Sequence, residues 1–457
     1  MDTASGSRRK SQSRERGITG ISISGYKSLV EGRSIEIRPL TILAGANSSG
    51  KSSAMQPLLL LKQTLEVSYD PGYLLLDGPN VRFTSADQFL PKLPGSPSLT
   101  PFVIAVQIDG IETLTLTFRK QAKKGIELIE MKHDMGKRVT TLRPEMPHAE
   151  IIAAVPDAVN FQQSIEGVGQ AAENSIFKDF RWSVDRNRCF LSVGLHPSAK
   201  GDSGPSSGAL VNLVNPAGPF ESNIRKLIHV PGLRGNPERT YRATAVGADF
   251  PGTFENYVAS VISHWQTTKD DRLGQLGSTL EALGLTWKVE TRQVDDTQVE
   301  LRVGRLKHSA RGGARDMVSI ADVGFGLSQT LPVLVALLTA LPGQMVYLEQ
   351  PEIHLHPRAQ SALARVLVDA AKRGVRIVAE THSSLLVMSV QSLIAEGYIA
   401  PDRVKLHWFR RRDDGITEVA SADLDKAGAY GDWPEDFADV TLEVESRYLD
   451  AAERSLG

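Results

Sequence analysis

One short segment has the residue types and spacing of a phosphate-binding loop (P-loop): Gly45-Ala46-Asn47-Ser48-Ser49-Gly50-Lys51-Ser52. Its glycines allow consecutive backbone N–H groups to point at phosphate oxygens, and the start of a following helix adds partial positive charge. Lys51 would neutralise β- and γ-phosphate oxygens, and Ser52 would ligate Mg²⁺. The pattern predicts that this loop, together with Ser53, binds ATP and Mg²⁺. The alternative is an ordinary turn with a solvated lysine.

A second candidate is an apolar strand that ends in an acid, Met345-Val346-Tyr347-Leu348-Glu349, which has the form of a Walker B segment. Its carboxylate would organise Mg²⁺ from the far side of the phosphates, so Glu349 joins Ser52 as a metal candidate. Many buried strands end in an acidic residue, and this segment alone would be weak evidence. Together with the P-loop, it indicates a nucleotide site.

Two further segments have residue types suited to contact with an anion. The first, Gly324-Phe325-Gly326-Leu327-Ser328-Gln329, combines glycines that permit close backbone approach with a helix start that favours an anion. The second is His382, which follows an apolar strand at the carboxyl edge of a predicted parallel sheet, where ligands bind in open α/β folds. Its imidazole could sense the γ-phosphate or orient water. The alternatives are a glycine-rich helix cap and a hydrogen-bonded structural histidine.

These motifs follow the order found in ABC-type ATPases of the SMC, RecF and OLD (overcoming lysogenization defect) group, and Leu348–Pro357 resembles the extended Walker B segment of that group. The resemblance covers about residues 21–78 and 316–446. It implies a homodimer, in which Ser328 contacts ATP held by the second subunit and the segment around His354 forms the D-loop of the interface. No TOPRIM-like acidic cluster follows, so any nuclease is expected to act in trans.

The residue after the Walker B acid departs from this family. Most ABC-type ATPases have a glutamate there that acts on the attacking water, whereas this sequence has Gln350. Glutamine can orient water but cannot accept its proton. The predicted catalytic residues are therefore Glu349, Gln350 and His382. Slow hydrolysis, assistance from Glu352 or His382, and an ATP-gated clamp are all left open.

Three weaker features have open interpretations. Glu352, His354 and His356 are close enough in sequence for a zinc site, although the D-loop interpretation is preferred. Gln88 is a weak candidate for a Q-loop. Arg234 could reach a phosphate or the dimer interface, and no catalytic role is assigned to it.

The elements around these motifs alternate between strand and helix, which predicts a largely parallel sheet. The expected fold class is α/β, an ABC-type P-loop ATPase head with a mostly parallel sheet and an inserted mixed α/β region. The predicted strands are residues 21–23, 35–37, 40–44, 102–107, 113–118, 287–290, 298–303, 345–348 and 376–379. The predicted helices are residues 52–63, 254–265, 273–283, 327–341 and 357–372, and residues 197–218 are predicted to form a loop.

The expected domain organisation follows from the motif positions. It comprises a flexible basic tail at 1–17, an ATPase N-terminal lobe with the P-loop at 18–90, an inserted mixed α/β region with lobe completion at 91–310, an ATPase C-terminal lobe at 311–410 and a C-terminal module at 411–457. The tail cannot bury a core, so it is expected to be solvated, with a DNA-contacting arm as the alternative. Residues 433–437 resemble part of a module found after such ATPase cores.

The composition excludes several classes of protein. With 457 residues, 41% hydrophobic and 23% charged, the chain is typical of folded globular proteins, and its net charge of −1 gives no global attraction to nucleic acid. The single cysteine, Cys189, cannot form an intrachain disulfide, and the lack of an apolar signal segment favours the cytoplasm. No apolar stretch approaches the roughly 20 residues that span a bilayer, so a membrane protein is not expected.

We therefore expect an ATP-binding hydrolase that dimerises around Mg-ATP and couples nucleotide state to an effector or to DNA, in anti-phage defence or DNA maintenance. The alternative is an ATP-gated scaffold with little hydrolysis that holds a partner nuclease or toxin. A kinase or GTPase could use the same loop, but Ser328 and His382 disfavour it. Association beyond the dimer is left open.

Overall fold

The structure is a computed structural model that describes residues 17–92, 101–121, 125–155, 180–197, 211–305, 316–431 and 446–447. The first sixteen residues of the predicted basic tail lie outside the described residues, as does the segment 433–437 of the predicted C-terminal module. Within the described part of the chain, no helix combines the length and the apolar character needed to cross a bilayer.

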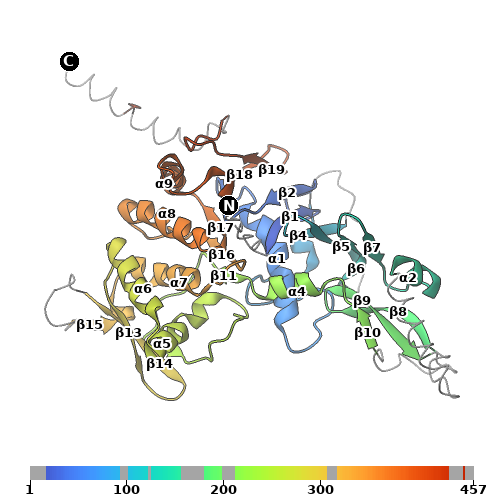
Figure 1. Ribbon diagram of the computed structural model, residues 1–457, viewed down its shortest axis with the longest axis horizontal. Helices are drawn as coiled ribbons and strands as arrows, with labels where there is room; N and C mark the ends of the chain where they lie inside the picture. The colour runs from blue at the N-terminus through green and yellow to red at the C-terminus, as the bar shows by residue number, and fades with distance from the viewer. Residues whose placement is uncertain are drawn as a thin grey trace, which may run out of the picture.

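A six-stranded sheet forms the centre of the described chain (Figure 1). Its order is β11 (Ile228–Val230), β16 (Met345–Glu349), β17 (Arg376–Thr381), β3 (Leu40–Gly45), β18 (Val404–Arg411) and β19 (Thr417–Ala422). The first five strands are parallel to their neighbours, and β19 runs antiparallel to β18. The prediction of an α/β fold with a mostly parallel sheet is confirmed. Strand β17 separates the Walker B strand β16 from the P-loop strand β3.

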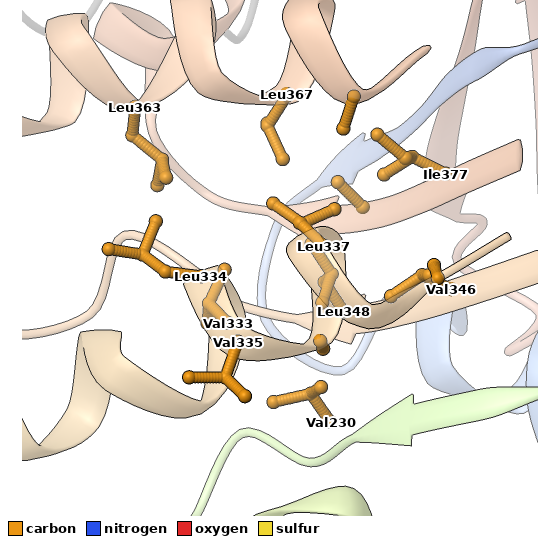
Figure 2. Close-up of a cluster of buried hydrophobic side chains, with 14 of the residues drawn as sticks. Val230, Val333, Leu334, Val335, Leu337, Val346, Leu348, Leu363, Leu367 and Ile377 are labelled. Carbon is orange, nitrogen blue, oxygen red and sulfur yellow. The ribbon is translucent and has the colours of Figure 1, made fainter. Parts of the chain in front are cut away.

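Both faces of this sheet pack against a hydrophobic core. Successive side chains of a strand point to opposite sides, so one strand can contribute to both cores. In β16, Val346 and Leu348 pack in one core with side chains of α7 (Phe325–Thr339) and α8 (Pro357–Lys372), as Figure 2 shows. Met345 and Tyr347 belong to the opposite core, which contains side chains of α1 (Lys51–Glu66). Burial on two sides explains why these strands are almost continuously apolar.

Helix α8 illustrates how the sequence sets the ends of an element. His356 Nδ1 accepts a hydrogen bond from the Arg358 amide (3.3 Å), and Pro357 occupies the first turn, where its missing N–H costs nothing. At the other end, Gly374 has φ 94°, which glycine adopts readily. The predicted range 357–372 is confirmed.

The remaining described strands form three further sheets, one of six strands and two smaller ones. One is antiparallel, in the order β2 (Arg33–Glu36), β1 (Ile18–Ser24), β4 (Phe102–Ile108), β5 (Glu112–Gln121), β6 (Gly125–Asp134) and β7 (Val139–Leu142). The second comprises β10 (Val211–Val214), β9 (Phe190–Pro197) and β8 (Phe180–Asn187). The third comprises β12 (Tyr241–Arg242), β14 (Gln298–Gly304) and β13 (Val289–Gln293), with β15 (Met317–Ser319) paired to β14.

Shorter helices connect these sheets. The α-helices are α2 (His148–Ala154), α4 (Gly218–Arg225), α5 (Val258–Thr268), α6 (Asp271–Ala282) and α9 (Ser384–Ala395). The 3₁₀ helices are η1 (Ala86–Gln88), η2 (Phe254–Tyr257), η3 (Ile320–Asp322) and η4 (Pro401–Arg403).

Two predicted elements differ from the structure. Residues 198–210 of the loop predicted at 197–218 lie outside the described residues. The prediction is wrong at β10, where Val211 pairs with Leu195 of β9, because the strand-forming Val and Leu residues outweigh the surrounding glycines and serines. The single helix predicted at 254–265 begins as the 3₁₀ helix η2 and becomes α-helical only at Val258, a common arrangement at helix N-termini.

Candidate functional site

The P-loop borders a cavity of about 640 Å³, a volume within the usual range for small-molecule sites. The lining comes from segments far apart in sequence: residues 47–53 of the loop, Gln350 after β16, Glu380 and His382 at the end of β17, and Arg411 at the end of β18. The sheet brings these segments together because the parallel strands β16, β17, β3 and β18 end at the same edge.

Two P-loop glycines occupy positions that a side chain could not share. Gly45 has φ 144°, and a Cβ there would lie 2.2 Å from the Phe409 carbonyl oxygen. Gly50 has φ 107°, and a Cβ there would lie 2.5 Å from Thr417 Oγ1. The loop also contains Ser49 Oγ, a buried atom with no hydrogen-bond partner in the described chain. Tight glycine turns and a buried hydroxyl without a partner fit a loop that closes around phosphate oxygens.

Lys51 lies across the P-loop. Its Nζ donates to the carbonyl oxygens of Gly45 (2.9 Å) and Ala46 (2.7 Å). Burial lowers the pKa of Lys51, and the carboxylates of Glu380 and Glu352 partly offset this effect. Within the described chain, the hydrogen bonds of the ammonium group are to neutral carbonyl oxygens, which a phosphate group would outcompete as acceptors.

Thr417, the first residue of β19, is hydrogen-bonded to the P-loop. Its hydroxyl lies 2.8 Å from the Ser49 carbonyl oxygen, to which it donates, and 2.7 Å from Ser28 Oγ. The Thr417 amide also donates to the Ser28 carbonyl oxygen at 2.8 Å. One fully buried side chain thus connects the P-loop, the N-terminal strand region and the β18–β19 hairpin.

Replacing Thr417 with valine should weaken ATP binding about fivefold, because a hydrogen bond of about 1 kcal/mol that shapes the loop is lost while the side-chain volume is nearly kept. Thr417→Ser retains the hydroxyl and should bind ATP like the wild type. Isothermal titration calorimetry measures both affinities. Equal affinity of the valine variant and the wild type would show that the hydroxyl does not shape the loop.

Glu349 is held away from the cavity lining. Its carboxylate lies 3.0 Å from His229 Nε2 and accepts from the Gly232 amide at 3.1 Å. Burial alone would raise the pKa of Glu349, but these hydrogen bonds and the charge of Arg234 hold it below the usual value. Ser52 Oγ instead donates to Glu380 Oε1 at 2.8 Å. The two predicted metal candidates, Ser52 and Glu349, are therefore not hydrogen-bonded to each other, and a different acid occupies the place beside Ser52.

Gln350 and His382, the other two predicted catalytic residues, both line the cavity. Gln350 has φ 45°, and its amide donates to the Glu380 carbonyl oxygen at 2.8 Å, which fixes the turn after β16. Burial and the charge of Lys51 lower the pKa of His382, while a hydrogen bond with the Gly45 backbone raises it. The imidazole is consequently neutral near pH 7 and could accept a hydrogen bond.

Glu352 is hydrogen-bonded to the segment that carries His382. Its Oε1 accepts from Thr381 Oγ1 (2.6 Å) and from the His382 amide (3.2 Å), and its Oε2 is buried without a partner in the described chain. The zinc alternative would require Glu352, His354 and His356 to converge, yet their contacts diverge: the His354 ring faces Phe325, and His356 caps α8. No group of three or more metal-ligating His, Cys, Asp or Glu side chains occurs among the residues described here.

The signature segment, residues 324–329, forms the N-terminus of α7 and does not line the P-loop cavity. Among the residues that the structure describes, no side chain caps this helix start, and Ser328 Oγ donates to the Phe325 carbonyl oxygen at 3.1 Å. The Phe325 side chain is 52% exposed. One chain therefore presents the P-loop and Ser328 at different places on its surface.

Arg234 is buried and ties three elements together. Its guanidinium donates to the carbonyl oxygens of Gln329 (3.0 Å), Glu349 (2.7 Å) and Gln350 (3.2 Å). Burial lowers the pKa of Arg234 to about 10, so the side chain stays protonated at neutral pH. The open interpretation that Arg234 reaches a phosphate is not supported in this conformation, because its hydrogen bonds point into the protein.

The sequence interpretation did not select several residues of this site or beside it, among them Glu380, Arg411 and Thr417. Glu380 was available by the same signal that selected Glu349, an acid at the end of a buried strand. Thr417 carried no signal, because nothing in a polar strand residue indicates contact with a loop far away in the chain. Gln88, the weak Q-loop candidate, does line the cavity, and its Oε1 accepts from the Thr84 amide at 2.8 Å.

Residues 194–389 match a protein-family model described as "AAA domain, putative AbiEii toxin, Type IV TA system". This stretch contains the signature segment, Glu349 and His382, whereas the P-loop precedes it. Residues 194–389 thus match an AAA-type ATPase domain, and the predicted relationship to the P-loop ATPases is confirmed.

Three solved structures are similar to this chain at low sequence identity. The SMC head bound to the C-winged helix domain of ScpA is 11% identical with a TM-score of 0.44, over 90% of this chain and 99% of that chain. The SMC head domain from Thermotoga maritima is 9% identical with a TM-score of 0.37, over 89% and 100%. The Smc head domain with an extended coiled coil bound to the C-terminal domain of ScpA, derived from Pyrococcus furiosus, is 11% identical with a TM-score of 0.44, over 90% and 98%. None of the curated proteins matches the chain.

Proposed function

We propose that this chain, which carries an AAA-type ATPase domain, binds Mg-ATP in the P-loop cavity, dimerises around two nucleotides and passes that closure to an effector or to DNA. The observation that carries the proposal is the convergence of Lys51, Ser52, Gln350 and His382 on one cavity of suitable size. These residues come from three segments that are far apart in the sequence: the P-loop, the end of the Walker B strand and the end of β17.

Each cavity residue has a part in this proposal. The amides of the P-loop and the Lys51 ammonium group would hold the phosphates, and Ser52 with an acid from the strand ends would hold Mg²⁺. Bound Mg²⁺ neutralises charge that develops on the phosphate oxygens. Gln350 would orient the attacking water, and the neutral imidazole of His382 would accept a hydrogen bond or contact the γ-phosphate.

The signature segment supports the dimer. Among the described residues no side chain caps the start of α7, so its first backbone N–H groups could donate to an anion, yet this helix start does not share the cavity with the P-loop of its own chain. A second copy would supply the phosphate. The exposed side chains of Phe325 and of Leu233, which is 90% exposed, are apolar surface that such a partner would cover.

The biological role in this proposal is anti-phage defence or DNA maintenance. Its support is the description of the matching family, which names a putative AbiEii toxin of a Type IV TA system. In this view ATP binding shifts the chain towards a closed dimer, and the shift is limited by the difference in ATP affinity between the open and closed states. A partner nuclease or toxin would respond to the closed dimer.

A scaffold with little hydrolysis is the second candidate, and Gln350 favours it. Replacing Gln350 with glutamate should raise the ATP turnover number by about 100-fold, because a carboxylate beside the water can accept its proton. Phosphate release measured on the purified chain, with and without DNA, tests this. Rapid turnover by the wild-type chain alone would exclude the scaffold, and an unchanged rate in Gln350→Glu would show that position 350 does not limit hydrolysis.

A further inference from the structure

Glu380 lies closer to the P-loop than the Walker B acid does. Its Oε1 accepts a hydrogen bond from Ser52 Oγ at 2.8 Å, and Ser52 is the P-loop hydroxyl expected to ligate Mg²⁺. The Glu349 carboxylate contacts His229 and Gly232 instead. The acid that is hydrogen-bonded to Ser52 is thus on β17 and not on β16.

The strand order accounts for this difference. In the parallel ladder Glu349 is the register partner of Glu380, and Glu380 is the register partner of Leu43 in the P-loop strand. Adjacent strands lie about 4.8 Å apart, so Glu380 stands one strand nearer to the P-loop than Glu349. Since Glu349, like its strand neighbour Tyr347, belongs to the α1 side of the sheet, the two carboxylates face the same helix.

The second oxygen of Glu380 is also held in place. Tyr347, fully buried on β16, donates its hydroxyl to Glu380 Oε2 at 2.8 Å, while Glu380 itself is 4% exposed. Hydrogen bonds from neighbouring side chains that orient a ligating carboxylate are typical of metal sites. Carboxylate and hydroxyl oxygens are also the ligands that Mg²⁺ prefers.

The Glu349 carboxylate is held by different contacts, which lie away from Ser52. One of its oxygens contacts the His229 ring of β11, and the other accepts from the Gly232 amide in the loop after β11. The His229 ring stacks on Tyr347 with centroids 5.4 Å apart, and its Nδ1 lies 3.0 Å from Asn80 Nδ2. These contacts make Glu349 an anchor for the loop that carries Arg234.

We propose that Glu380 is the carboxylate that holds Mg²⁺ together with Ser52, and that Glu349 positions the loop of residues 229–234. This inference rests on the proposed function, because it assigns a residue of the proposed Mg-ATP site. It replaces the expectation that Glu349 is the metal acid.

The test compares ATP affinity of the full chain with Mg²⁺ and with EDTA by isothermal titration calorimetry. The wild type should bind ATP more tightly with Mg²⁺. Glu380→Gln should lose this Mg²⁺-dependent gain by about tenfold or more while its affinity in EDTA is kept, because the amide retains the shape but not the charge of the ligand. Glu349→Gln should retain the gain and affect turnover instead.

A parallel readout is the electron paramagnetic resonance spectrum of Mn²⁺ with ADP, in which Glu380→Gln should weaken the bound Mn²⁺ signal. If Glu380→Gln does not fold, as judged by its melting temperature, Glu380→Asp keeps the charge and shortens the side chain, and it should lose part of the gain. A full Mg²⁺-dependent gain in the folded position-380 variant, or its loss in Glu349→Gln alone, would overturn the assignment and leave the proposed function standing. A wild-type chain that binds no ATP in either buffer would overturn both.

Discussion

ATP binding is expected to be lost in the Lys51→Ala variant, with an affinity at least about 100-fold below that of the wild type. The reason is that the Lys51 ammonium group is the only lysine or arginine charge of the P-loop, and it is partly buried next to neutral carbonyls. With ATP bound, Lys51 and the phosphates would form a buried charge pair. Removing one partner of such a pair costs about 3 kcal/mol or more of binding free energy, which corresponds to that loss of affinity. Calorimetric titration with ATP and Mg²⁺ measures it.

A matched control is Lys137→Ala, which removes an exposed lysine from the turn between β6 and β7, outside the cavity lining. Its ATP affinity should equal that of the wild type. The melting temperature of ligand-free Lys51→Ala should also stay close to the wild-type value, because its two carbonyl partners can bind water. Unchanged ATP binding by Lys51→Ala would refute the assignment of residues 45–53 as the nucleotide site.

The second large effect is expected in Ser328→Arg, which should bind ATP normally but fail to dimerise. Ser328 does not line the cavity of its own chain, so binding of ATP to the monomer is preserved. A long side chain at the start of α7 would sterically block the approach of a second subunit. Its positive charge would also be repelled by the partial positive charge at the N-terminus of the helix. Loss of this phosphate contact should lower turnover by about 100-fold.

Light scattering coupled to size-exclusion chromatography, with and without ATP, gives the mass of each variant. The wild type should show an ATP-dependent increase to the dimer. Ser392→Arg is a suitable control, because Ser392 is also an exposed helical serine whose Oγ donates to a carbonyl within its own helix, in this case that of Met388 at 3.0 Å. A wild-type chain that stays monomeric with ATP, or a Ser328→Arg chain that still dimerises, would exclude the signature segment as the dimer contact.

Local sequence determined those features that depend on neighbouring residues. The range of α8 follows from His356, Pro357 and Gly374 at its ends, and the P-loop follows from glycines that backbone geometry requires at positions 45 and 50. The hairpin of β4 and β5 around Asp109 and Gly110 was likewise predictable from turn residues. In each case the energy that decides the conformation comes from a few adjacent residues.

Tertiary structure decided which of the selected residues meet. Glu349 and Glu380 both lie at the ends of buried strands and therefore have the same local sequence pattern. The sequence alone could not show which of the two acids lies beside Ser52. The position of β17 between β16 and β3 places Glu380, and not Glu349, beside Ser52. In the same way, the pairing of β18 with β3 brings Thr417 to the P-loop. Strand order is set by the packing of the whole sheet between two cores, and no short segment contains that information.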